Sequence, residues 1–167
     1  MLPPDTAPAP VVDRRWRLLA LIWAPFVSLF VFAAGFWGGD TYSHVLFHVL
    51  ALALLGWALT ELRRTARLFS TGRLRRVLTL VLFVSLPLAI LGHGVELITA
   101  LVRLVNEGWA HVDTDDIFEE GPHAWAANIT VPMMMISMLS ALALVIVTTV
   151  QRRKDSEPVE REMRSVR

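Results

Sequence analysis

The stretch VLTLVLFVSLPLAILGHGVELI, residues 77–98, decides the fold of this chain. It is apolar over a length that can cross the roughly 30 Å hydrocarbon core of a bilayer as one helix. Pro87 lies inside it and is expected to kink that helix. Its only ionisable side chains are His93 and Glu96. Because ionisable groups are costly in hydrocarbon, those found there are usually functional. The stretch therefore predicts a membrane span that carries a site.

Three further apolar runs, at residues 18–37, 42–62 and 123–150, are also long enough to span a membrane. Of the 167 residues, 54% are hydrophobic and 19% are charged, against roughly 25% charged residues in soluble domains. The first run follows arginines, as the core of a signal peptide would. Its length of about 20 residues, however, exceeds the roughly 7–15 residues of such a core. We therefore predict an all-α fold, a bundle of four transmembrane helices.

The distribution of charge predicts which ends of the spans face the cytoplasm. Arginines precede the first run, fill the loop between the second and third, and follow the fourth, whereas the loop at 106–122 carries acidic residues and no lysine or arginine. The positive-inside rule then predicts cytoplasmic N- and C-termini and an extracytoplasmic loop 106–122. Lys154 is the only lysine among 16 basic residues. That bias indicates a GC-rich bacterial genome, and hence a multi-pass protein of the bacterial cytoplasmic membrane.

Two tails are predicted on either side of a transmembrane domain at residues 14–150. Residues 1–13 are rich in proline and lack helical periodicity, which predicts a disordered N-terminal tail. Residues 151–167 predict a charged cytoplasmic tail. The absence of cysteine excludes disulfides, thiolate metal sites, iron–sulfur clusters and a cysteine nucleophile. No phosphate-binding glycine loop or helix-turn-helix pattern occurs, so the lipid bilayer, and not nucleic acid, is the expected partner.

The polar residues of the second and third spans are predicted to share one layer. His44 and His48 are four residues apart, and His93 and Glu96 are three apart, so each pair lies on one side of its helix. A rise of about 1.5 Å per residue, counted from the first cytoplasmic arginine of each span, puts all four within about 8 Å of one another in height. They fall in the outer third of the core, with Glu96 at its rim. The glycines beside His93 leave room for close helix contact or for a bulky group.

These side chains predict a transition-metal site in the outer leaflet with His44, His48, His93 and Glu96 as ligands. Neutral imidazoles with one carboxylate suit zinc, iron or copper. The three histidines form the core of the predicted site.

The fourth span contributes Glu120 and His123, which have the Glu-x-x-His spacing of di-iron carboxylate bundles. Gly121 and Pro122 interrupt the helix between them. The same count of residues puts His123 about 43 Å above Arg152, which predicts that it lies outside the histidine layer. Glu120 and His123 are therefore secondary candidates for the ligand set.

Methionines of the fourth span fall at the level of the histidines on this count, about 21–27 Å above the arginine end. They are Met134, Met135 and Met138. Thioethers beside imidazoles suit Cu(I) or a haem iron, so Met134 and Met138 are also secondary candidates. The competing interpretation is that these methionines pack against neighbouring helices, because methionine fills irregular gaps.

Three other functions are compatible with the same residues. A b-type haem could be held between His48 and His93 and exchange electrons with a quinone, as in four-helix membrane cytochromes. The histidines could instead lock the helices of an accessory or structural subunit that assembles with other membrane proteins. His93 and Glu96 could also relay protons. The sequence favours no reaction, and an enzyme and a binding protein are both compatible with it.

Overall fold

The computed structural model describes residues 11–37, 41–69, 72–107 and 121–165, and within these ranges every regular element is a helix. The four long helices are α1 (Val11–Trp37), α2 (Thr41–Thr65), α3 (Arg73–Glu107) and α5 (Gly121–Ser165). A short 3-10 helix, η1 (Ala66–Phe69), follows α2 directly.

Each long helix contains a segment that is long and apolar enough to cross a membrane. The prediction of an all-α chain with four such helices is confirmed. The segments are Arg14–Ala33, Thr41–Thr65, Arg73–Asn106 and Gly121–Gln151.

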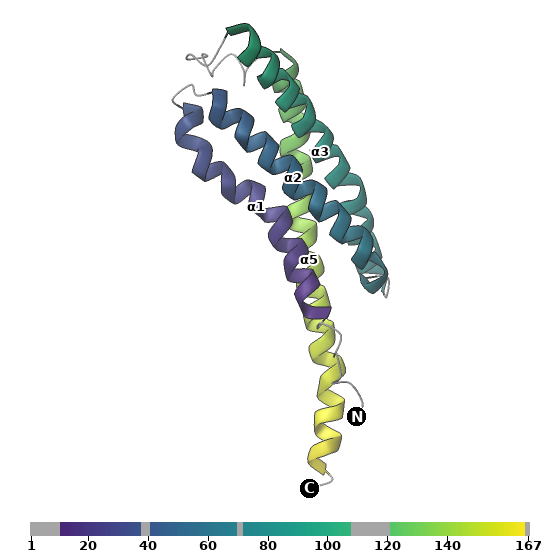
Figure 1. Cartoon of the computed structure of the whole chain (residues 1–167). Coiled ribbons are helices and arrows are strands. Elements are labelled where there is room, and N and C mark those ends of the chain that lie inside the picture. Colours follow the sequence, from purple (N-terminus) through teal and green to yellow (C-terminus); the bar gives the residue numbers. More distant parts are fainter. Residues whose placement is uncertain (1–10, 38–40, 70–71, 108–120, 166–167) are drawn as a thin grey trace, which may run out of the picture.

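The helices form an elongated bundle in which α3 packs along α5 and α2 packs against both α1 and α3 (Figure 1). Helix α1 touches α5 over one part of its length only. The indole N–H of Trp23 donates to the carbonyl of Met138 (3.3 Å), and a hydrogen bond joins Arg15 to Thr149 (3.4 Å). Toward its C-terminal end, α1 diverges from α5 and follows α2 (Figure 1). The histidine-bearing helices α2, α3 and α5 therefore pack without α1 between them.

Helix α5 continues without a break through residues 151–165, the segment predicted as a charged tail. It projects past the ends of the other three helices (Figure 1). Residues 1–10 of the predicted N-terminal tail lie outside the described residues, and α1 begins at Val11.

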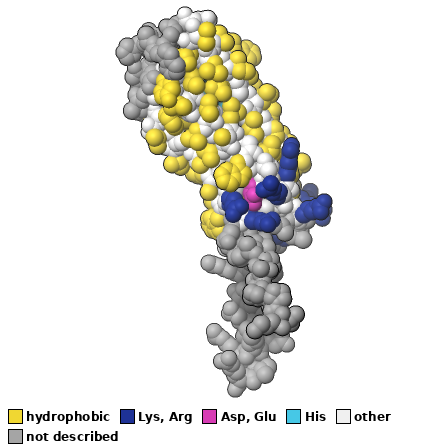
Figure 2. Space-filling model, in the orientation of Figure 1, with side chains coloured by type: hydrophobic (Ala, Val, Ile, Leu, Met, Phe, Trp, Pro, Cys, Tyr) yellow, Lys and Arg dark blue, Asp and Glu magenta, His cyan; other side chains and the backbone are white. Residues whose placement is uncertain are grey.

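Apolar side chains cover the visible face of the bundle, and basic side chains gather at one end of it (Figure 2). Valines, leucines and phenylalanines are among the many exposed apolar residues. An apolar surface of this extent is unusual for a soluble monomer and suits contact with lipid. We call the end that carries the basic side chains the arginine end. Its exposed members include Arg63, Arg64, Arg67, Arg73 and Arg76.

The buried interior has two layers along the bundle axis. Nearer the arginine end, apolar side chains of all four long helices form a continuous core, to which α1 contributes Ile22 and α3 contributes Leu82 and Leu86. Toward the opposite end, the buried positions of α2, α3 and α5 include four histidines, a glutamate and threonines, together with Phe47 and several alanines. This second layer is the candidate site.

Candidate metal-binding site

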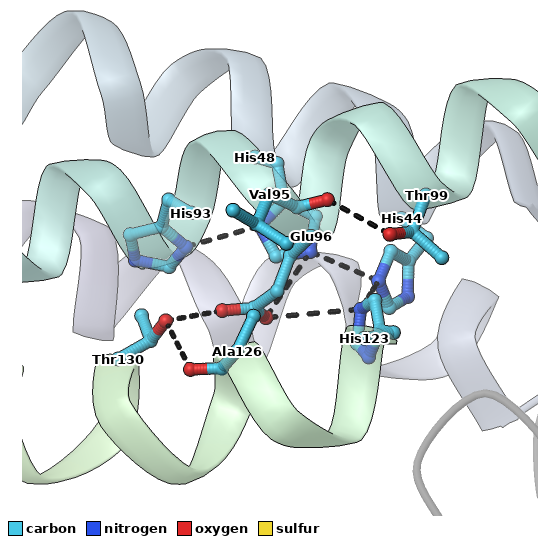
Figure 3. A network of polar contacts seen from close by, with 9 residues as sticks. All are labelled: His44, His48, His93, Val95, Glu96, Thr99, His123, Ala126 and Thr130. Atoms are coloured by element: carbon cyan, nitrogen blue, oxygen red, sulfur yellow. Dashed lines mark hydrogen bonds and ion pairs between the residues drawn. The ribbon is translucent and has the colours of Figure 1, made fainter. Parts of the chain in front are cut away.

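Four histidines and one glutamate from three helices meet in the polar layer (Figure 3). Their exposed fractions lie between 1% and 6%, so all five are buried. Helix α2 supplies two of them, α3 two and α5 one: His44 and His48, His93 and Glu96, and His123. The prediction that His44 and His48 share one side of α2 is confirmed, because their rings contact each other and residues of α3 and α5.

Three imidazole nitrogens converge on one point. The Nε2 atom of His44 lies 2.8 Å from Nε2 of His123 and 2.9 Å from Nε2 of His48. All three ring nitrogens lie within 4.8 Å of one another. The Oε2 atom of Glu96 lies 3.6 Å from Nε2 of His48 and 3.7 Å from Nε2 of His123. Oε2 of Glu96 thus lies beside two of the three ring nitrogens, those of His48 and His123.

The two contacts of His44 Nε2 compete with each other. A ring nitrogen of neutral histidine has either one N–H or one lone pair in the ring plane. His44 Nε2 nevertheless faces two other nitrogens at hydrogen-bond distance, and it can form a linear bond with only one of them. A cation at the centre would accept all three lone pairs together. Bonds of about 2.0–2.1 Å in a tetrahedral shell separate the ligand atoms by about 3.3–3.4 Å, and the observed separations of 2.8–3.7 Å lie on both sides of that value.

The carboxylate of Glu96 is oriented by a neighbour on α5. The hydroxyl of Thr130 hydrogen-bonds to Oε1 of Glu96 and lies 2.9 Å from the carbonyl oxygen of Ala126 (Figure 3). Oε1 is therefore engaged, and Oε2 is the oxygen that faces the imidazoles. Partners of this kind fix the orientation of ligands in metal sites.

Gly92 makes the contact between Thr130 and Glu96 sterically possible. A Cβ atom at position 92 would lie 2.0 Å from Oγ1, 3.1 Å from Cβ and 3.3 Å from Cα of Thr130. At Gly94, by contrast, an added Cβ would meet nothing within 4 Å. Of the two interpretations left open for these glycines, close helix contact applies to Gly92.

His93 lies in the predicted layer, beside His48. Its Nδ1 atom lies 3.0 Å from Nδ1 of His48, on the side of that ring away from the three converging nitrogens. Two groups of residues each have possible ligand atoms that lie within 4.8 Å of one another. One group holds His44, His48 and His123, and the other holds His48, His93 and Glu96. His44 and His93 do not occur together in either. The predicted core of three histidines is thus divided, with His48 common to both groups.

The prediction that His123 lies outside the histidine layer is wrong, since its Nε2 atom lies 2.8 Å from that of His44. A signal was available in the sequence: His123 and Thr130 are seven residues apart, two helical turns, and so share a face of α5. Glu120, the other candidate from this part of the chain, lies outside the described residues.

Part of the error came from the choice of Arg152 as the reference point. The hydroxyls of Ser85 on α3 and Ser137 on α5 are 2.7 Å apart and mark a common level. Ser85 follows Arg76 by nine residues, whereas Ser137 precedes Arg152 by fifteen. Arg152 therefore lies about six residues, or roughly 9 Å, beyond the assumed level. Because α5 is helical past that point, no break in the chain marks where the span ends.

The same correction moves the methionines out of the histidine layer. Met134 and Met138 are buried in the apolar core among leucines, and Met135 is exposed. Their positions on either side of Ser137 place them level with Ser85 and not with His93. The structure therefore does not bring these thioethers to the imidazoles.

A haem between His48 and His93 does not fit this geometry. Two axial nitrogens must lie on opposite faces of the macrocycle, about 4 Å apart. The Nδ1 atoms of the two rings are 3.0 Å apart and in hydrogen-bond contact, and the ring of Phe47 packs edge-on against both imidazoles, with centroid distances of 5.2 and 5.7 Å.

Comparisons of this chain with protein-family models, with curated proteins and with solved structures found no match.

Proposed function

We propose that this chain is a multi-pass membrane protein that binds one transition-metal ion inside its helix bundle. The ligand atoms are Nε2 of His44, His48 and His123, with Oε2 of Glu96. The observation that carries the proposal is the convergence of three imidazole nitrogens in a buried site, where Nε2 of His44 lies 2.8 Å from Nε2 of His123 and 2.9 Å from Nε2 of His48. Imidazole nitrogens directed at one buried point are what a transition-metal site requires.

The donor set favours a divalent ion of intermediate softness. Three imidazoles and one carboxylate suit zinc, iron(II) or copper(II). The thioethers that would favour Cu(I) lie in the apolar core. Four protein ligands fill a tetrahedral shell, which is typical of zinc sites that bind the ion without an open coordination position. We therefore propose that the site holds or hands on a metal ion, and that the ion ties α2, α3 and α5 together.

The orientation in the membrane is part of the proposal. The positive-inside rule, applied to the exposed arginines at the arginine end, supports cytoplasmic termini and an extracytoplasmic loop 106–122. Residues 108–120 of that loop lie outside the described residues. Domain boundaries follow from the orientation, with a transmembrane domain at 14–150 and a cytoplasmic segment at 151–167. The metal site then lies in the half of the bilayer away from the cytoplasm, in the bacterial cytoplasmic membrane.

The proposal is tested by metal analysis of the full chain, purified in detergent with an affinity tag that contains no histidine. After chelation and reloading with Zn²⁺, we expect about one ion per chain by elemental analysis. The variants His44→Leu and His123→Leu are each expected to lose it. The chain offers a matched control in His111, the one histidine that lies outside the described residues, and His111→Leu should retain the ion. Wild-type protein that binds no Zn²⁺, Fe²⁺ or Cu²⁺ and unfolds at the same temperature with and without chelator would contradict the proposal.

A further inference from the structure

We infer that His93 is a positioning residue: it accepts a hydrogen bond from His48 and thereby holds that imidazole in the tautomer that binds the metal. This inference rests on the proposed metal site. It concerns the residue that the sequence placed among the ligands, and it assigns that residue a different role.

The position of one proton follows from the metal bond. A neutral imidazole that offers a lone pair from Nε2 must carry its proton on Nδ1. Nε2 of His48 is the atom that faces His44 and Glu96. Its Nδ1 atom, 3.0 Å from Nδ1 of His93, is therefore the donor. His93 has to present a lone pair there, because two N–H groups cannot face each other at that distance.

The tautomer of His93 follows in the same way. With its Nδ1 accepting from His48, a neutral His93 carries its own proton on Nε2. That Nε2 atom is buried and has no hydrogen-bond partner among the residues that the structure describes. Burying an unpartnered donor is unfavourable, and the hydrogen bond from His48 to Nδ1 offsets part of that cost.

The geometry also argues against His93 as a ligand to the same ion. The Nδ1 atom of His93 contacts Nδ1 of His48, which is the His48 nitrogen that points away from the proposed ion. Phe47 packs edge-on against the rings of both His48 and His93, with interplanar angles of 63° and 77°, and holds the pair in register. Hydrogen-bond partners of this kind keep metal-binding histidines in one tautomer and one orientation.

Two substitutions separate a positioning role from a ligand role. In His93→Asn, the amide oxygen takes the place of Nδ1 and can accept from His48. In His93→Leu, the bulk is similar and no acceptor is left. We expect Zn²⁺ affinity, measured by competition with a chromophoric chelator, to fall about 10- to 100-fold in His93→Leu. His93→Asn should recover most of that loss, and both variants should still bind one ion per chain. His44→Leu should bind none.

A spectroscopic measurement on the wild-type protein tests the same inference without any variant that must fold. The measurement is ¹⁵N NMR of Zn²⁺-loaded protein with ¹⁵N-labelled histidine. We expect Nδ1 of His48 and Nε2 of His93 to be protonated and Nδ1 of His93 to be unprotonated.

Several results would overturn the inference while leaving the metal site intact. The first is loss of stoichiometric binding in His93→Leu without recovery in His93→Asn, and the second is a Zn²⁺ affinity of His93→Leu equal to that of the wild type. The other two are binding of two ions per wild-type chain and a protonated Nδ1 on His93. Two ions would instead assign the group of His48, His93 and Glu96 to a second metal position. Wild-type protein without any bound metal would overturn the proposed function as well, and so the two failures are distinguishable.

Discussion

The two buried layers of the bundle use the same helices and obey different rules. In the apolar core, Leu55 of α2, Leu86 of α3 and Leu144 of α5 fill space, and any side chain of similar volume could do so. In the polar layer, each group is held by a directed contact, such as that between Thr130 and Glu96. Lipid is as apolar as leucine, so burial alone does not drive helices together in a bilayer. The comparison indicates that the polar layer determines how α3 and α5 meet, and that the apolar layer follows.

The largest effect is expected from Gly92→Ala. The added Cβ would lie 2.0 Å from the hydroxyl of Thr130 and 3.3 Å from its Cα, so a change of rotamer alone does not relieve the clash. Separation of α3 from α5 should displace the carboxylate of Glu96, and Zn²⁺ affinity should fall by more than about 100-fold. Gly94→Ala, where the Cβ meets nothing within 4 Å, is the control and should bind Zn²⁺ like the wild type. Equal affinities in the two variants would show that α3 and α5 do not make this contact.

A smaller loss is expected from Thr130→Val, which keeps the shape of the side chain and removes its hydroxyl. Without the hydrogen bond to Oε1, Glu96 is free to rotate, and Zn²⁺ affinity should fall about 10- to 100-fold. Thr130→Ser retains the hydroxyl and should stay close to the wild type. If valine and serine behaved alike in a chelator competition, the orientation of Glu96 would not depend on Thr130.

Leu86→Ala probes the apolar layer and should affect stability without affecting the site. Leu86 is fully buried, and its truncation leaves a cavity that we expect to cost about 2 kcal/mol, the lower end for such substitutions. Leu86→Met should cost less than about 1.5 kcal/mol because the volume is conserved. Zn²⁺ affinity should be unchanged in both. Thermal unfolding in detergent, run with and without chelator, measures the two quantities side by side, and a large change in affinity would show that the layers are coupled.

The smallest effect is expected where a polar pair interrupts the apolar layer. The hydroxyl of Ser137 donates to the carbonyl of Met133 (2.8 Å), so Ser85 is the donor in its contact with Ser137 (2.7 Å). Interhelical hydrogen bonds of this kind in membranes contribute about 0.6 kcal/mol on average. A double-mutant cycle with Ser85→Ala and Ser137→Ala should give a coupling energy of about that size and no change in Zn²⁺ affinity. A coupling above about 2 kcal/mol, beyond the range usual for such bonds, would place this pair with the polar layer in importance.

Some features of this protein follow from the sequence alone. Four apolar runs predict four helices because a helix is the one local structure that satisfies its backbone hydrogen bonds within a single segment. The pairing of His44 with His48 follows from a spacing of four residues, which the period of the helix places on one side. The candidate ligands are histidine and glutamate side chains and the chain has no cysteine, which restricts the class of metal.

Only the tertiary structure determines the axial position of α5 relative to α3. An apolar helix carries no local mark of its depth, so the count from Arg152 misplaced His123 and the methionines, whereas the contact between Ser85 and Ser137 marks residues of α3 and α5 at the same level. It also decided which nitrogen of each histidine faces the centre. The difference between a ligand and its hydrogen-bond partner, His48 and His93, lies in side-chain rotation and in neighbours from other helices. The periodicity of the sequence reveals neither the rotation of a side chain nor its neighbours from other helices.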